Sequence, residues 1–295
     1  MRLVPLLTTA LLTLTLGLQA QAGPTLDRIQ AQGFMTLAHR ESSVPFSYLD
    51  ADKKPIGYAL DLCLRVVDAV RAKLRLSALP VKYLPVTAAS RIQTIAGGQA
   101  DLECGSTTNN AERRQQVAFT VPHFIAGARF LVRSDSTVST LNGFQGLKLV
   151  STKGTTPLKA ITAANTDRLM GITVLEAPDH ARAVEMVEKG EADGFAMDDV
   201  LLYGLMAARP DPKKLKVVGK FLSIEPLAIM LSKDDAEFKR IVDNEMKRLV
   251  RSREAHALYE RWFSQPIPPH QQPLQLPMSH LLREFWKYPS DEVPF

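Results

Sequence analysis

Polar and charged side chains in this sequence gather at one kind of position, directly after short apolar runs that are typical of β-strands. In an open α/β sheet, ligands bind beyond the carboxyl ends of the strands, where such segments converge. Their hydroxyls, arginines, histidine and carboxylates are hydrogen-bonding groups suited to a small charged ligand. The polar segments are residues 39–43, 87–91, 105–110 with Arg113 shortly after, 154–156, 179–180 and 198–199.

The arginines of these segments predict the charge of the ligand. We expect Arg40, Arg91 and Arg113 to face one or two carboxylates at most. An unpaired arginine in a closed cleft carries a large desolvation penalty, and a guanidinium pairs with a carboxylate through two parallel hydrogen bonds. The ligand should therefore have a net negative charge, with one aspartate in the cleft for an ammonium group. Two carboxylates and one ammonium group describe glutamate and aspartate.

One of the segments also resembles a helix start. Thr156 is placed as the N-cap and Pro157 as the first helical residue, so the free N–H groups that follow would hold an α-carboxylate. The same pattern fits a helix cap without a ligand. The sequence has no Walker loop, G-x-S-x-G, H-E-x-x-H or C-x-x-C motif, and we expect no catalytic residue, metal or cofactor.

Short apolar runs alternate with segments of helical period, which is typical of an α/β fold. The period allows either one sheet of about nine strands, or two sheets with the chain crossing near 128–134 and back near 221–228. The proline-rich stretch after residue 265 should wrap over the surface without adding to the core. Expected strands are 34–38, 81–84, 102–104, 128–132, 147–151, 172–175, 194–197, 216–218 and 227–231; expected helices include 59–76, 157–170, 181–189 and 235–263.

The N-terminal residues predict export. Arg2 precedes an uncharged apolar stretch, and Ala20 and Ala22 form an A-x-A site, so residues 1–22 have the pattern of a cleaved signal peptide. A membrane anchor is the weaker alternative, because the apolar run is short for a span of roughly 20 residues. We therefore expect a protein that is free in an extracytoplasmic space. The formal net charge of +5 comes from scattered basic residues without interleaved aromatics, which gives nucleic-acid binding no support.

The two cysteines, Cys63 and Cys104, leave two interpretations open. An oxidising compartment permits a disulfide between them. Cys63 lies on the apolar face of an expected helix and Cys104 ends an expected core strand, so both also fit buried free thiols. We favour the free thiols.

Long blocks of the sequence carry a resemblance. The chain resembles the periplasmic glutamate/aspartate-binding proteins of ABC importers, within the family of polar amino-acid binding proteins. The matching segments extend from about residue 25 to 270. The two most specific are HRESSVPFSY at 39–48 and ECGSTTNN at 103–110, and shorter ones are GTT at 154–156, DH at 179–180 and MDD at 197–199.

The resemblance implies a two-lobed periplasmic binding protein fold of type II, hinged by two crossover strands. Lobe 1 would comprise residues 23–130 and 228–295, and lobe 2 residues 131–227. It implies capture of L-glutamate or L-aspartate by a monomer that delivers its ligand to the membrane permease of an importer.

The resemblance also implies roles for eight site residues. Arg113 would hold the α-carboxylate with Ser106, Thr108 and Thr156, and Asp198 would hold the α-ammonium group. Arg40, Arg91 and His180 would surround the side-chain carboxylate. One departure is Ala88, where the family pattern has serine. The loss of one hydrogen bond, about 0.5–1.5 kcal/mol, bears on the preference between glutamate and aspartate.

Two other functions are compatible with such a fold. Exported cyclohexadienyl dehydratases, which act on prephenate or arogenate, resemble amino-acid binding proteins, but an enzyme needs an acid in the cleft to expel a leaving group. The strand-end acids that we consider for this step are Glu41, Asp198 and Asp199, and Asp198 already has a role. A ligand-sensing module that signals to a separate membrane partner is the second alternative.

Overall fold

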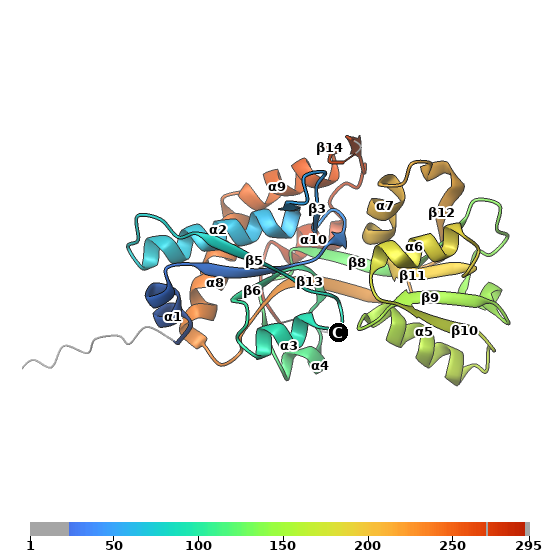
Figure 1. Cartoon of the computed structure of the whole chain (residues 1–295), viewed down its shortest axis with the longest axis horizontal. Coiled ribbons are helices and arrows are strands. Elements are labelled where there is room, and N and C mark those ends of the chain that lie inside the picture. Colours follow the sequence, from blue (N-terminus) through green and yellow to red (C-terminus); the bar gives the residue numbers. More distant parts are fainter. Residues whose placement is uncertain (1–23, 270, 293–295) are drawn as a thin grey trace, which may run out of the picture.

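Two bodies of strands and helices lie side by side in the structure, a computed structural model that describes residues 24–269 and 271–292 (Figure 1). The predicted signal peptide lies outside the described residues. Within the described part of the chain, no helix is long and apolar enough to cross a membrane.

The first lobe is built on parallel strands. β1 (Met35–His39) lies between β5 (Val81–Pro85) and β6 (Leu102–Thr108). α2 (Tyr58–Lys73) packs on β6 through an apolar stripe that includes Cys63, Val66 and Val70, because these residues recur at helical spacing. α3 (Arg91–Ala96) lies on the opposite face of the sheet, next to the short α4 (Ala111–Arg114) (Figure 1).

The second lobe repeats this arrangement with a later part of the chain. β9 (Lys148–Thr152) lies between β10 (Thr173–Ala177) and β11 (Gly194–Asp198), and all three run parallel. α6 (His180–Glu188) and α7 (Asp199–Ala207) cover one face of these strands, and α5 (Thr156–Asp167) covers the other (Figure 1).

Two antiparallel strands connect the lobes. β8 (Phe124–Arg133) pairs with β13 (Ile224–Leu231) through its first half, and with β11 and β12 (Leu215–Val218) through its second half. β13 continues into the first lobe, where it pairs with β6 and β7 (Ala118–Phe119). The strands thus form one continuous order, β10-β9-β11-β8-β13-β6-β1-β5. The predicted pair of crossover strands is present, and the lobe boundaries at 130–131 and 227–228 stay a prediction.

The remaining elements are short and were not predicted individually. They are α1 (Pro24–Gln32), β2 (Ser42–Ser43), β3 (Ser47–Leu49), β4 (Pro55–Ile56), η1 (Leu141–Phe144), η2 (Pro212–Lys214), β14 (Pro266–Ile267) and β15 (Gln272–Pro273).

The long helix expected at 235–263 is two helices, α8 (Ala236–Arg251) and α9 (Glu254–Phe263). Arg253 between them adopts a left-handed backbone with φ of 66°, which ends the first helix. The single-helix prediction was wrong because neither glycine nor proline marks the break.

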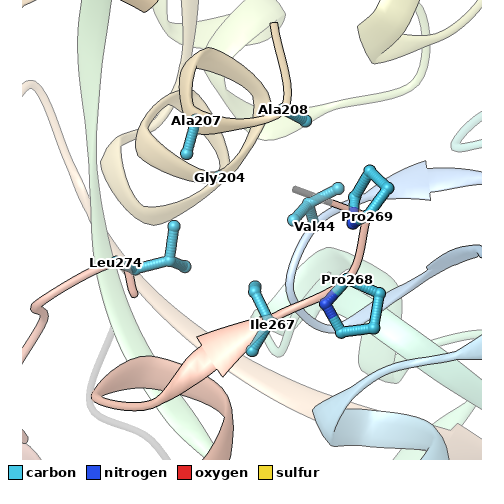
Figure 2. Close-up of a pocket in the computed structure, with 8 residues that line it drawn as sticks. All are labelled: Val44, Gly204, Ala207, Ala208, Ile267, Pro268, Pro269 and Leu274. Carbon is cyan, nitrogen blue, oxygen red and sulfur yellow. The ribbon is translucent and has the colours of Figure 1, made fainter. Parts of the chain in front are cut away.

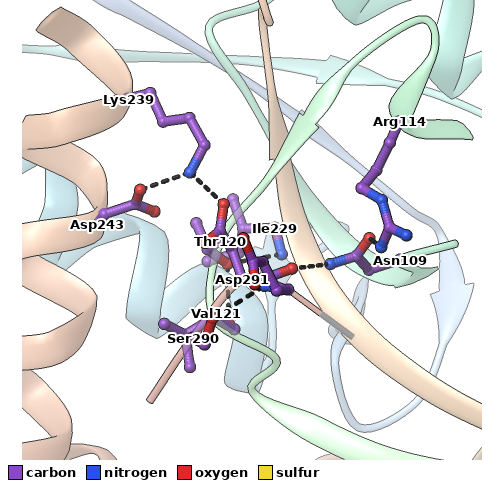
Figure 3. Close-up of polar contacts among 10 residues, drawn as sticks. Asn109, Arg114, Thr120, Val121, Ile229, Lys239, Asp243, Ser290 and Asp291 are labelled. Carbon is purple, nitrogen blue, oxygen red and sulfur yellow. Dashed lines mark hydrogen bonds and ion pairs between the residues drawn. The ribbon is translucent and has the colours of Figure 1, made fainter. Parts of the chain in front are cut away.

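The C-terminal tail contributes to the core, so that prediction was also wrong. After the proline-rich stretch, α10 (His280–Phe285) buries Leu282, and the following Trp286 is buried with its Nε1 donating to the Pro122 carbonyl at 3.0 Å. Figure 3 shows where the tail is then held: the Asn109 amide donates to the Asp291 carbonyl at 2.8 Å, and Lys239 donates to the Asp291 carboxylate at 2.7 Å.

Cys63 and Cys104 form a disulfide, with their Cα atoms 6.2 Å apart. The bridge joins α2 to β6, which pack against each other, and both cysteines are fully buried. The preference for two free thiols was therefore wrong. Their pairing depends on the docking of a helix onto a strand 41 residues away in sequence.

Candidate functional site

All eight predicted site residues lie in one cluster between the lobes, and all of them except the half-buried Thr156 are buried. Six of them line a cavity of about 10 Å³, which is room for about one water molecule, so the lobes lie closed against each other. The six are Arg91, Ser106, Thr108, Thr156, His180 and Asp198; Thr155, Pro157, Met197 and Leu201 complete the lining. Arg40 and Arg113 adjoin this lining, through His180 and Thr108 respectively.

Arg113 bridges the two lobes. Asn110 caps α4 by accepting from the Arg113 N–H at 3.0 Å, which holds the backbone of this arginine beside the end of β6. Its guanidinium donates to the Thr108 carbonyl at 2.9 Å and to the Gly154 carbonyl of the second lobe at 3.3 Å. Burial and nearby Arg91 lower its pKa to about 10, so the group stays a cation at neutral pH.

Arg40 and His180 meet across the same interface. Asp179 caps α6 by accepting from the Arg182 N–H at 2.8 Å, and His180 is the first helical residue. Its Nδ1 lies 2.7 Å from the Thr152 hydroxyl and its Nε2 lies 3.5 Å from Arg40 Nη2. Burial, with Arg40 and Arg91 nearby, lowers the pKa of His180 well below its usual value, so the imidazole is neutral. Because the His180 imidazole is neutral, the Arg40 guanidinium can lie next to it without charge repulsion.

Asp198 presents an unsatisfied carboxylate. It ends β11, is 3 % exposed, and its Oδ1 is buried without a hydrogen-bond partner among the described residues. Burial and the neighbouring Glu225 and Asp199 raise its pKa well above the usual range. A cation in the cavity would relieve both the burial penalty and this repulsion, so the position suits an ammonium group.

The predicted count of carboxylates was wrong. Glu103 on β6 and Glu225 on β13 are also buried, and their charges act on Arg91 and Arg113. Three buried arginines therefore face three buried carboxyl groups, counting Asp198. The net charge of the cluster does not by itself require an anionic ligand, and the ligand class has to rest on other observations.

Glu103 and Glu225 are the residues that the strand-end positions missed. Each interrupts an apolar strand rather than following one, and a carboxylate inside an apolar run is the signal that would have found them. Glu103 accepts from the Thr107 hydroxyl at 2.8 Å, and Glu225 accepts from the Thr156 hydroxyl at 2.7 Å.

The helix start after β9 differs by one residue from the prediction. Thr155, not Thr156, is the N-cap, with an extended backbone and a hydroxyl that accepts from the Leu158 N–H at 3.4 Å. Thr156 is the first residue of α5 instead. Its hydroxyl is therefore free to face the first lobe, 3.2 Å from the Thr108 hydroxyl and within reach of Glu225.

A buried histidine outside the cavity lining predicts a pH dependence of stability. His123 is fully buried between the rings of Phe46 and Tyr58, and burial lowers its pKa to about 3. Below pH ~6.5 the unfolded chain takes up a proton at this ring that the folded chain does not, so stability falls with falling pH. We expect His123 alone to cost about 2 kcal/mol of unfolding free energy at pH 5 relative to pH 7.

The measurement is urea unfolding at both pH values for the wild type, for His123→Phe, and for His280→Gln at an exposed histidine as control. His123→Phe should reduce the difference between the two pH values by about 2 kcal/mol. An unchanged difference would contradict the role of His123.

Comparison with known protein families identifies the family of this chain. Residues 35–265 match the family model of the bacterial extracellular solute-binding proteins, family 3. The protein belongs to this family. The match spans both lobes of this family 3 solute-binding protein and ends where the proline-rich tail begins.

Curated relatives match over nearly the whole chain. The protein is 41% identical to an L-glutamate/L-aspartate-binding protein of Pseudomonas aeruginosa, over 99% of both chains. It is 38% identical to a glutamate/aspartate import solute-binding protein of Escherichia coli, over 92% of this chain and 90% of the relative.

Solved structures share the fold. A mutant arginine-binding protein of T. maritima superposes with a TM-score of 0.72 at 22% identity, covering 80% of this chain and 98% of that one. An ancestral amino acid-binding protein, described as a precursor of cyclohexadienyl dehydratase, superposes with a TM-score of 0.69 at 24% identity, over 82% and 100% of the chains. These likenesses confirm the predicted two-lobed α/β fold.

Proposed function

We propose that this protein captures L-glutamate or L-aspartate outside the cytoplasm and delivers it to the membrane permease of an ABC importer. The observation that carries the proposal is the 41% identity to an L-glutamate/L-aspartate-binding protein over 99% of both chains. The buried arginines and the unsatisfied Asp198 support it, because they suit the carboxylates and the ammonium group of such a ligand.

The site residues keep their predicted roles in this proposal. Arg113, with Ser106, Thr108 and Thr156, holds the α-carboxylate, and Asp198 holds the α-ammonium group. Arg40, Arg91 and His180 surround the side-chain carboxylate; the neutral imidazole adds a hydrogen bond there without a charge. The two lobes open about β8 and β13 to admit the ligand and close over it.

Capture is favoured over catalysis. The curated relatives are named as binding proteins, whereas the fold is shared with a precursor of cyclohexadienyl dehydratase and does not separate the two functions. Glu41, one candidate acid for an enzyme, is exposed. Incubation with prephenate or arogenate should yield no aromatic product.

The location and the assembly complete the proposal. The family is extracellular, which agrees with a periplasmic protein exported by the signal peptide at 1–22. We expect a monomer that meets its membrane partner in the closed form. A sensing role would need a different membrane partner and the same ligand.

The ligand class is tested by thermal unfolding with a panel of amino acids, on protein first stripped of carried-over ligand by unfolding and refolding. At a concentration of 100 times the dissociation constant, glutamate or aspartate should add about 2.7 kcal/mol of stability. The melting temperature should then rise by roughly 5–10 °C. Glutamine, lysine and leucine at the same concentration should produce much smaller shifts, and a larger shift with lysine or glutamine than with glutamate would refute the assignment.

A further inference from the structure

A second contact between the lobes lies away from the ligand cavity. Gly204 of α7 packs against the backbone of Val44, in the loop after β2 of the first lobe. A Cβ atom on Gly204 would lie 2.8 Å from the carbonyl carbon of Val44 and closer still to its oxygen. Real Cβ atoms do not approach backbone that closely, so any side chain at position 204 would require α7 or the Val44 backbone to shift.

Small residues and the C-terminal tail surround this contact closely. Figure 2 shows Gly204 and Ala207 of α7, with Ala208 directly after the helix, beside Val44 and the C-terminal tail. The hollow between them has a volume of about 10 Å³, which is room for about one water molecule, and a Cβ on Gly204 would point at the Val44 backbone. Its other walls are Ile267, Pro268, Pro269 and Leu274. The Tyr48 hydroxyl donates to the Pro268 carbonyl at 2.8 Å, which fixes this part of the tail to the first lobe.

Another glycine at the interface lies similarly close to the backbone of the other lobe. A Cβ on Gly154 of the second lobe would lie 2.7 Å from the Ala88 carbonyl oxygen and from the Ala89 Cα. Gly154 has a φ of +79°, however, so a substitution there would strain its own backbone as well. Gly204 lies inside a helix, where alanine is a better helix former than glycine. A substitution at position 204 therefore tests the contact between the lobes without straining the helix backbone.

We propose that Gly204 and Val44 form a closure seat that sets ligand affinity without touching the ligand, because the lobes close fully only while position 204 has no side chain. The proposal rests on the proposed function, since it assumes that L-glutamate binds the closed form. A methyl group at 204 raises the free energy of the closed form and leaves the open form unchanged, because opening separates α7 from Val44. Apparent affinity then falls in proportion to the population of the binding-competent state.

The test compares Gly204→Ala and Gly204→Leu with the wild type by calorimetry with L-glutamate, by thermal unfolding without ligand, and by small-angle scattering at saturating L-glutamate. Gly143→Ala is the matched control: it lies in the same lobe, and its nearest neighbour is the side chain of Val138 of that lobe. Gly204→Ala should weaken glutamate binding at least tenfold, and Gly204→Leu should weaken it further. Both should keep the ligand-free melting temperature within a few degrees and show a larger radius of gyration than the liganded wild type.

The outcomes separate this inference from the proposed function. A wild type that binds no glutamate would overturn both. A wild type that binds, with Gly204→Ala binding as tightly or no more weakly than Gly143→Ala, would overturn the closure seat alone. So would a ligand-free melting temperature that falls sharply in Gly204→Ala, because the methyl group would then disturb the free protein and not its closure.

Discussion

Arg113→Ala should weaken the binding of every amino-acid ligand by about thirtyfold to several thousandfold. The substitution removes one partner of a buried, hydrogen-bonded charge pair, which costs roughly 2–5 kcal/mol. Because Arg113 also bridges Thr108 and Gly154 of opposite lobes, its loss weakens the closed form as well. Calorimetry with glutamate, aspartate and glutamine measures the effect, and the three ligands should lose affinity by similar factors.

Two further variants make this expectation specific. Arg114→Ala removes the neighbouring arginine, whose guanidinium donates to the Asn109 side chain at 2.9 Å and does not line the cavity, so its affinity should change little. Arg40→Ala should cost glutamate about tenfold to a hundredfold and narrow its advantage over glutamine, since glutamine lacks the distal carboxylate. Equal losses for both ligands in Arg40→Ala would show that the roles at the two ends of the ligand are misassigned.

Replacing both cysteines by alanine should lower the free energy of unfolding by about 4 kcal/mol. The bridge between Cys63 and Cys104 closes a loop of 41 residues and so restricts the unfolded chain. Urea unfolding of Cys63→Ala/Cys104→Ala against the oxidised wild type measures the difference.

A thiol titration provides the control for this second prediction. The wild type, unfolded without reductant, should show no reactive thiol, and two should appear after reduction. Two reactive thiols in the unreduced protein would restore the free-thiol interpretation and remove the expected loss of stability.

The local pattern of apolar and polar residues predicted several strands well, because that pattern lies within the strand and its immediate neighbours. The expected strands at 81–84, 147–151 and 194–197 lie within one residue of β5, β9 and β11 at each end, because an apolar run bounded by polar residues is a property of neighbours in sequence. The strand at 102–104 was too short: β6 continues to Thr108, since its polar residues are buried between the lobes and pair with β13. Arg253 ended a helix without any composition signal.

The sequence by itself determined the α/β fold, the strand-end positions of the candidate site and, through long matching blocks, the family. These depend on residue types and on spacing along the chain. Only the tertiary structure decided that Cys63 meets Cys104, that Glu103 and Glu225 face the arginines, and that Gly204 meets Val44. Each of these is a contact between segments far apart in sequence. Such contacts depend on how helices dock on the sheet and how one lobe closes on the other. The periodicity of apolar residues along the chain does not predict them.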